Sequence, residues 1–337
     1  MRPLQWSLAS LLLLGAAVAH ADAPKPAEPG PWKFGAVAGL NVSQSSFSSN
    51  WSGGDRGSIV WVLNSDLNAD RQFSKKFNLA NRLQLAYGQT SRQTSNADGD
   101  LVWDTPDKTT DLIAFESTGR FTLERWADPY AALRMDSQFE DQSSPLGVVR
   151  FNPVKLKETA GLARVLFKTE DSEGLMRFGL GFRQTLARSI DPVTLERQRF
   201  TSNDGGLEWQ TNVARPVLDK KVLYKGQLMV FLPVFYSKSS ALEDFDAAAI
   251  AAFPGREAVA DYWRAPDVSF QNNFSASITK YLSVNLYAQL VYDKFDSAAN
   301  VDPAKPLADQ IAEVDRNVRK AGQFKETLSL GLTYRLF

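Results

Sequence analysis

Cysteine is absent from the 337 residues, and the single histidine is His20. The lack of cysteine excludes disulfide bonds and thiolate metal sites. We expect His20 to be removed with an N-terminal signal peptide, which would leave no imidazole in the mature chain. Histidine-dependent catalytic triads and histidine-ligated zinc or iron would then be unavailable. The sequence therefore predicts a protein that is not an enzyme and has no catalytic residue, no cofactor and no metal. An enzyme that uses carboxylates alone is the alternative.

The chain also lacks a long hydrophobic run beyond its first residues. The apolar run Leu8–Val18 is too short to span a bilayer, and it is followed by a small-residue cleavage motif that ends at Ala21. We predict a signal peptide over residues 1–21, cleaved after Ala21. A Pro-rich periplasmic lead-in over 22–31 and one domain over 32–337 would follow.

Neither sign of charge dominates, because 38 basic residues face 38 acidic ones. Without a net basic field, the sequence does not favour a nucleic-acid partner. The mean hydropathy of −0.27 is slightly polar. A bundle of membrane helices would be more apolar, whereas a β-barrel with a polar lumen and polar loops fits this value.

The last twelve residues alternate between apolar and polar side chains. One face would carry Leu328, Leu330, Leu332, Tyr334 and Leu336. A final strand with one apolar and one polar face is typical of a barrel closed in lipid. The ending also resembles the C-terminal signal of bacterial outer-membrane barrels, so we expect the barrel assembly machinery to bind this strand.

Period-two alternation predicts about twelve strands, with ten or fourteen as alternatives. The predicted strands are 32–43, 58–69, 77–89, 109–123, 129–139, 154–167, 175–189, 207–217, 222–237, 268–279, 282–293 and 324–337. Long and short connections alternate between them, which is the pattern of long outer loops and short periplasmic turns. The fold class is therefore predicted as all-β, a transmembrane antiparallel up-and-down β-barrel in a bacterial outer membrane.

Charged side chains lie on the polar face of many predicted strands. The candidate lumen-lining residues are Arg82, Glu116, Arg120, Arg134, Asp136, Glu158, Arg164, Arg177, Arg183, Glu208 and Lys225. Their signs are mixed, and we expect many to pair across neighbouring strands. Two interpretations remain open: a salt-bridged interior that supports the wall, or a narrow aqueous path with the same lining.

Two long connections have helix-forming composition, within 241–262 and 306–320. Pro306 suits the first turn of a helix, and Leu307, Ile311 and Val314 form one apolar stripe. Such helices could cover the mouth as a lid, bind a surface partner, or pack on the rim.

Several segments carry a family resemblance. They are Asn50-Trp-Ser-Gly-Gly54, Phe77–Gly88, Lys108–Phe115 and Tyr130–Phe139. Over roughly 32–190 the chain resembles an uncharacterised family of bacterial outer-membrane proteins, known as a domain of unknown function and common in Bacteroidetes-like bacteria. The resemblance implies an outer-membrane barrel, and it supplies no substrate and no active-site residue.

These observations together predict a narrow pore or solute-uptake channel for a small polar solute. Lipid and lipopolysaccharide would surround its wall. The alternative is a non-conducting structural or surface-interaction barrel that acts through its extracellular loops.

Overall fold

A computed structural model describes most of the domain. The described residues are 28–45, 56–97, 100–123, 125–142, 146–190, 195, 197–244, 259–279, 281–296, 304–317 and 322–335. The predicted signal peptide, most of the lead-in, and the terminal Leu336 and Phe337 lie outside this part of the chain.

Within the described residues, twelve long strands form the wall. They are β1 (Lys33–Ser45), β2 (Ser58–Ser74), β3 (Phe77–Ser95), β5 (Asp107–Phe121), β6 (Asp128–Ser137), β9 (Val154–Lys168), β10 (Glu173–Ile190), β11 (Arg197–Val217), β12 (Val222–Tyr236), β13 (Asp267–Ser277), β14 (Leu282–Tyr292) and β15 (Gln323–Arg335). Three short strands lie in the connections: β4 (Leu101–Trp103), β7 (Glu140–Asp141) and β8 (Val149–Arg150).

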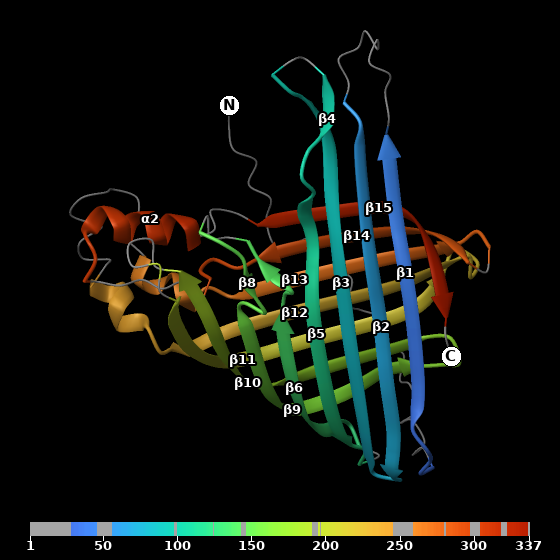
Figure 1. Cartoon of the computed structure of the whole chain (residues 1–337). Helices are drawn as coiled ribbons and strands as arrows, with labels where there is room; N and C mark the ends of the chain where they lie inside the picture. Colours follow the sequence, from blue (N-terminus) through green and yellow to red (C-terminus); the bar gives the residue numbers. More distant parts are fainter. Residues whose placement is uncertain are drawn as a thin grey trace, which may run out of the picture.

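Each wall strand pairs antiparallel with its neighbours, and the first strand pairs with the last. The sheet therefore closes on itself as a barrel, and its tilted strands cross at a wide angle in Figure 1. The predicted twelve-stranded antiparallel barrel is confirmed. Among the described residues, the seam between the two ends of the chain is the shortest junction in the wall, since it joins Val37–Asn41 of β1 to Gly331–Arg335 of β15.

The connections divide the barrel into two ends, which we name the turn end and the loop end. Short turns such as Lys75-Lys76 lie at the turn end, together with the start of β1 and the C-terminal end of β15. The loop end carries the connection that holds α2 (Leu307–Asn317) and the one that holds the 3-10 helix η2 (Val259–Arg264), as Figure 1 shows.

Several predicted strand boundaries are wrong: β2 and β3 run on to Ser74 and Ser95, and the largest error is at the start of β11. The strand predicted over 207–217 begins at Arg197, because β10 and β11 pair continuously from Ile190↔Arg197 to Glu173↔Ala214. Polar residues on both faces and the adjacent Gly205 and Gly206 hide the alternation in this segment. The connection predicted over 190–206 is correspondingly short.

The outer face of the wall is apolar and exposed. Leu180 is 68% exposed, Val234 66% and Leu328 71%. On β15, Leu328 and Leu330 point outward as predicted, whereas Gly331 on the opposite face is buried. A continuous band of such side chains requires a lipid environment rather than water. No helix in the described part of the chain is long and apolar enough to cross a membrane.

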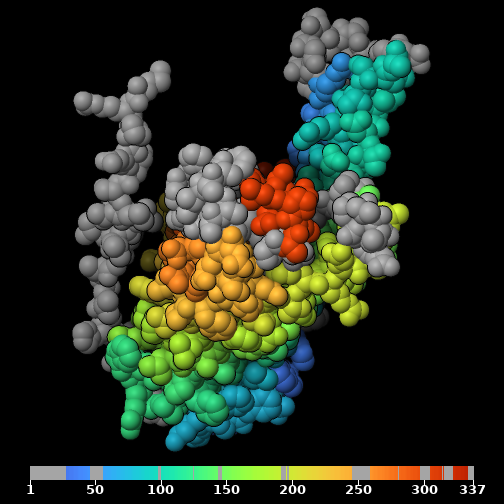
Figure 2. Space-filling model, turned by 90° about the vertical axis from the view of Figure 1, so that its left-hand side faces the viewer, coloured from blue at the N-terminus to red at the C-terminus, as the bar shows by residue number. Residues whose placement is uncertain are grey.

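A helical cap packs over the loop end. Its core consists of Tyr236, Leu242, Val259, Phe295, Ile311 and Val314. In Figure 2, η2 and α2 lie together over this end of the molecule. The helix predicted over 306–320 is confirmed as α2. Residues 239–244 are helical, and 245–258 lie outside the described residues. The two long connections thus share one hydrophobic core.

Candidate functional site

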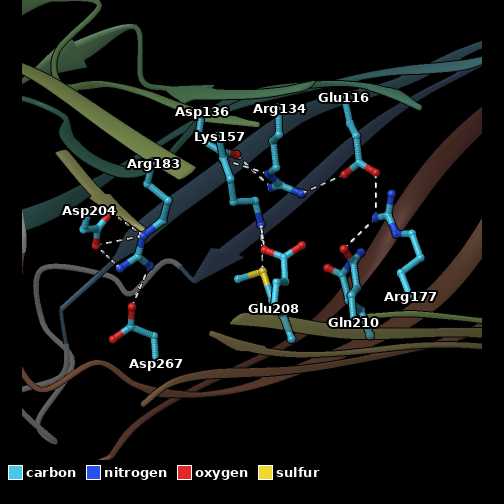
Figure 3. Close-up of polar contacts among 12 residues, drawn as sticks. Glu116, Arg134, Asp136, Lys157, Arg177, Arg183, Asp204, Glu208, Gln210 and Asp267 are labelled. Carbon is cyan, nitrogen blue, oxygen red and sulfur yellow. Dashed lines mark hydrogen bonds and ion pairs between the residues drawn. The ribbon is translucent and has the colours of Figure 1, made fainter. Parts of the chain in front are cut away.

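A network of charged side chains crosses the middle of the lumen. We name it the ion-pair belt, and it contains Glu116, Arg134, Asp136, Lys157, Arg177, Glu208 and the amide of Gln210. These residues come from five strands, β5, β6, β9, β10 and β11, so the belt links strands that are not neighbours in the sheet (Figure 3).

Arg177 and Glu116 stand at the centre of the belt. Arg177 Nη2 donates to Glu116 Oε1 at 2.7 Å and to Gln210 Oε1 at 2.6 Å. The other Glu116 oxygen lies 3.5 Å from Arg134 Nη1, and Arg134 binds Asp136 through Nε at 2.7 Å and Nη2 at 2.8 Å. Each charge thereby meets an opposite charge, which a low-dielectric interior requires.

Two glycines let β9 and β10 approach closely next to Arg177. Gly161 and Gly179 are paired across β9 and β10, and a Cβ on Gly161 would lie only 2.1 Å from the carbonyl oxygen of Phe178. The Arg177 guanidinium lies 5.5 Å from the ring centroid of Tyr130. Arg177 is therefore only 5% exposed, and water reaches this level of the lumen poorly.

A second cluster lies nearer the loop end. We name it the Arg183 cluster; it contains Arg183, Asp204 and Asp267. Arg183 Nε donates to the two Asp204 oxygens at 2.9 and 3.0 Å, and Nη1 lies 2.6 Å from Asp267 Oδ2. The guanidinium also stacks on Phe231, 3.8 Å from the ring centroid, and Phe231 is 1% exposed. This half of the lumen is filled.

Asp293 lies between the Arg183 cluster and the cap, one residue past the end of β14. Its Oδ1 is buried and has no hydrogen-bond partner within the described residues. Burial, together with the nearby carboxylates of Asp267 and Asp296, raises the pKa of Asp293 to about 7, while the cations of Lys155 and Arg183 act in the opposite direction.

A polar cavity of about 640 Å³ occupies the other half of the lumen. It extends from exposed residues at the turn end, including Lys33 and Lys168, to Arg134, Arg177 and Gln210 of the belt. The belt is thus the closed inner end of a water-accessible chamber.

The structure places nine of the eleven candidate lumen residues on the inner face. The belt and the Arg183 cluster contain Glu116, Arg134, Asp136, Arg177, Arg183 and Glu208, the cavity wall contains Arg82 and Arg120, and the β11–β12 register puts Lys225 on the same face.

The predicted positions of Glu158 and Arg164 are wrong, because both residues face outward. Glu158 is paired with Leu133 and Phe182 on the lipid-facing side, and its inner neighbour Lys157 enters the belt instead. Arg164 lies over the ring of Trp126, 5.4 Å from its centroid, near the turn end. Lys157 therefore takes the lumen position that the sequence analysis gave to Glu158.

Glu158 is an anomaly of the outer wall. It lies in an apolar groove whose lining includes Leu133, Ala160, Leu180 and Phe182, and its Oε2 is buried without a hydrogen-bond partner among the described residues. A carboxylate that faces hydrocarbon in this way destabilises the barrel.

Replacing Glu158 by leucine should therefore stabilise the folded barrel by on the order of 1 kcal/mol. Urea titration of folding into lipid vesicles measures this change. Arg164→Leu is the matched control on the same strand and face, and it should give no gain, because Arg164 already has Trp126 as its partner. A loss of stability in Glu158→Leu would show that the carboxylate has a partner in the membrane.

Part of the chain is similar to a known protein family. A family model described as a protein of unknown function, DUF3078, matches residues 42–142. This is part of the predicted span 32–190 and less than a third of the chain. No curated protein is significantly similar to it.

Among solved structures, the chain is similar to the COG4313 outer membrane channel from Pseudomonas putida F1, with 11% identity, 94% of this chain and 98% of that chain covered, and a TM-score of 0.35. It is also similar to the beta domain of the Bordetella autotransporter BrkA, with 12% identity, 90% and 98% coverage, and a TM-score of 0.32. The translocator domain of the autotransporter NalP from Neisseria meningitidis matches with 6% identity, 90% and 87% coverage, and a TM-score of 0.35. The assignment of a membrane barrel to this chain depends on its own strand pairing and apolar outer face.

Several lumen residues were not found from the sequence. Lys157 and Gln210 belong to the belt, Asp66 binds Arg82, and Asp204 and Asp267 hold Arg183. Asp204 lay in a segment predicted as loop, and Asp267 preceded a predicted strand by one residue. A basic residue on a lumen face without an acidic neighbour was the only signal that could have pointed to them.

Proposed function

We propose that this protein is a narrow outer-membrane channel for small polar solutes, and that the ion-pair belt and the cap close it in the present conformation. The observation that carries the proposal is the polar cavity of about 640 Å³, which runs from the turn end to the belt. A barrel whose interior served only as a support would have no need of such a chamber.

The belt has the features of a gate rather than of a permanent plug. It is made of side chains, and Arg177 has partners on β5 and β11 but none on a plug domain. Exchange of these ion-pair partners opens a path without unfolding a strand. In the proposed orientation the turn end is periplasmic and the loops are extracellular, as the signal peptide and the short turns predict.

Arg177→Ala should turn a mostly silent barrel into one with steady conductance steps, because it removes the group that fills the centre of the lumen. The measurement is ion current through refolded protein in a planar lipid bilayer, with and without removal of residues 241–262. Arg164→Ala is the matched control, since Arg164 lies on the outer wall; its current should equal that of the unaltered chain.

Silence of the Arg177 variant both with and without the cap residues would contradict the channel and favour the second candidate. That candidate is a non-conducting barrel which acts through its extracellular loops, and the observation in its favour is the shared hydrophobic core of the cap. Its ligand would then contact the cap surface rather than the lumen.

Three expectations remain predictions: the absence of enzymatic activity and cofactors, the lipopolysaccharide around the wall, and binding of the assembly machinery to β15. Loss of a specific hydrolytic activity on replacing Glu116 or Asp136 would contradict the first.

A further inference from the structure

Amide side chains make up much of the cavity wall on the turn-end side of the belt. On the lumen face they are Asn68, Asn78, Gln84, Gln210, Asn212 and Gln227. An amide offers both hydrogen-bond donors and an acceptor. The cavity can therefore bind hydroxyl groups, which also donate and accept.

The charges next to the belt are engaged with one another, whereas Lys33 and Asp70 nearer the turn end form no ion pair within the described residues. Arg82 donates to Asp66 at 2.9 Å, Lys168 lies 3.4 Å from Glu173, and Glu116 lies between Arg134 and Arg177. A small ion that reached the inner end of the cavity would lose water and meet the already paired charges of the belt, which disfavours ionic ligands there.

Several amide atoms keep hydrogen-bonding capacity for a ligand. Asn212 Oδ1 accepts from Gln227 Nε2 at 2.9 Å and from Gln210 Nε2 at 3.4 Å. Within the described residues this leaves Asn212 Nδ2, Gln227 Oε1 and the Gln84 amide without protein partners, and none of these atoms is buried. They face the solvent of the cavity.

We propose that the cavity binds a small uncharged polyhydroxylated solute of the monosaccharide class. The inference rests on the proposed channel function, for which it names the class of solute. The volume of about 640 Å³ is within the range of small-molecule sites. Asn212 and Gln227 are the specificity-determining residues, because each has a free amide atom next to the belt.

The test is calorimetric titration of the refolded full-length protein with three sugars of one ring size: D-glucose, anionic D-glucuronate and cationic D-glucosamine. Glucose should bind at least ten-fold more tightly than either charged sugar. The double variant Asn212→Leu and Gln227→Leu should weaken glucose binding at least ten-fold. Gln289→Leu is the matched control: its amide on β14 binds Tyr287 and Ser269 and lies outside the cavity lining, so glucose binding should be unchanged.

Equal or tighter binding of a charged sugar would overturn the solute class, and equal loss in the Gln289 control would overturn the site. Absence of glucose binding would also overturn the inference. Conductance of the Arg177 variant separates this failure from failure of the channel. If the Arg177 variant conducts but the protein does not bind glucose, the proposed channel function stands and the solute class is wrong. If the variant is silent but the protein binds glucose, the binding site stands and the channel function is wrong.

Discussion

Replacing Arg183 by leucine is expected to lower the free energy of unfolding by about 3–5 kcal/mol. The guanidinium holds two carboxylates, Asp204 and Asp267, in the filled half of the lumen, and Asp204 is only 4% exposed. Leucine leaves both carboxylates close together in a low-dielectric site without the guanidinium that binds them. The change is measured by urea unfolding of the vesicle-inserted barrel and by its electrophoretic mobility with and without heating.

The controls separate charge from packing. Arg188→Leu removes an arginine from the same strand, where the guanidinium is exposed and bonds the carbonyl of Phe151. It should cost no more than about 1 kcal/mol. Adding Asp204→Asn and Asp267→Asn to Arg183→Leu should recover most of the lost stability. If the triple variant is as unstable as the single one, the stacking of Arg183 on Phe231 rather than its charge explains the effect.

The packing of the cap on the barrel should be most stable at acidic pH and should become less stable as the pH rises toward 7. The pKa of Asp293 is raised to about 7 in the capped state, against an ordinary value of 3.8. Below pH 4 the carboxyl is protonated with the cap on or off, and its contribution is fully present. Between 4 and 7 the uncapped state, in which the carboxyl is less buried, loses the proton first, so the stability of the cap falls as the pH rises. Above 7 the curve is flat.

Hydrogen exchange of α2 and η2 between pH 4 and 8 measures this dependence. Asp293→Asn should give protection that no longer varies with pH in this window, because the neutral amide occupies the same place. Asp261→Asn, an exposed carboxyl in η2 that binds Arg264, is the control and should keep the pH dependence. Persistence of the dependence in Asp293→Asn would assign it to Asp267 or Asp296 instead.

The strands could be predicted from the sequence because lipid and lumen impose opposite demands on alternate residues. β3 shows this clearly, with Leu79, Leu83 and Leu85 outward and Arg82 and Gln84 inward. Tilted strands of this length give the alternation enough residues to be recognised. The number of strands and their order follow from the short turns between them.

β9 shows why the site could be predicted only in part. Its inner face carries Lys157 and then Thr159, Gly161 and Ala163, and in the strand register Tyr130 and Arg177 lie opposite Gly161 and Ala163. Its outer face carries Glu158 and Arg164. Counting charges therefore chose the wrong face, since the demand for small inner residues comes from β10 and β6 and is not visible within β9. The acidic partners on other strands were not predicted for the same reason, because their positions depend on contacts between strands.

The short seam between β1 and β15 bears on how the ring is made. These two strands lie at opposite ends of the chain, so bringing them together costs more conformational entropy than forming any other junction. Among the described residues, the pairing of Val37–Asn41 with Gly331–Arg335 offsets this cost. Before that junction forms, the other eleven junctions can already exist as a curved open sheet with two unpaired edge strands. We therefore expect ring closure to be the slowest step in the assembly of the barrel.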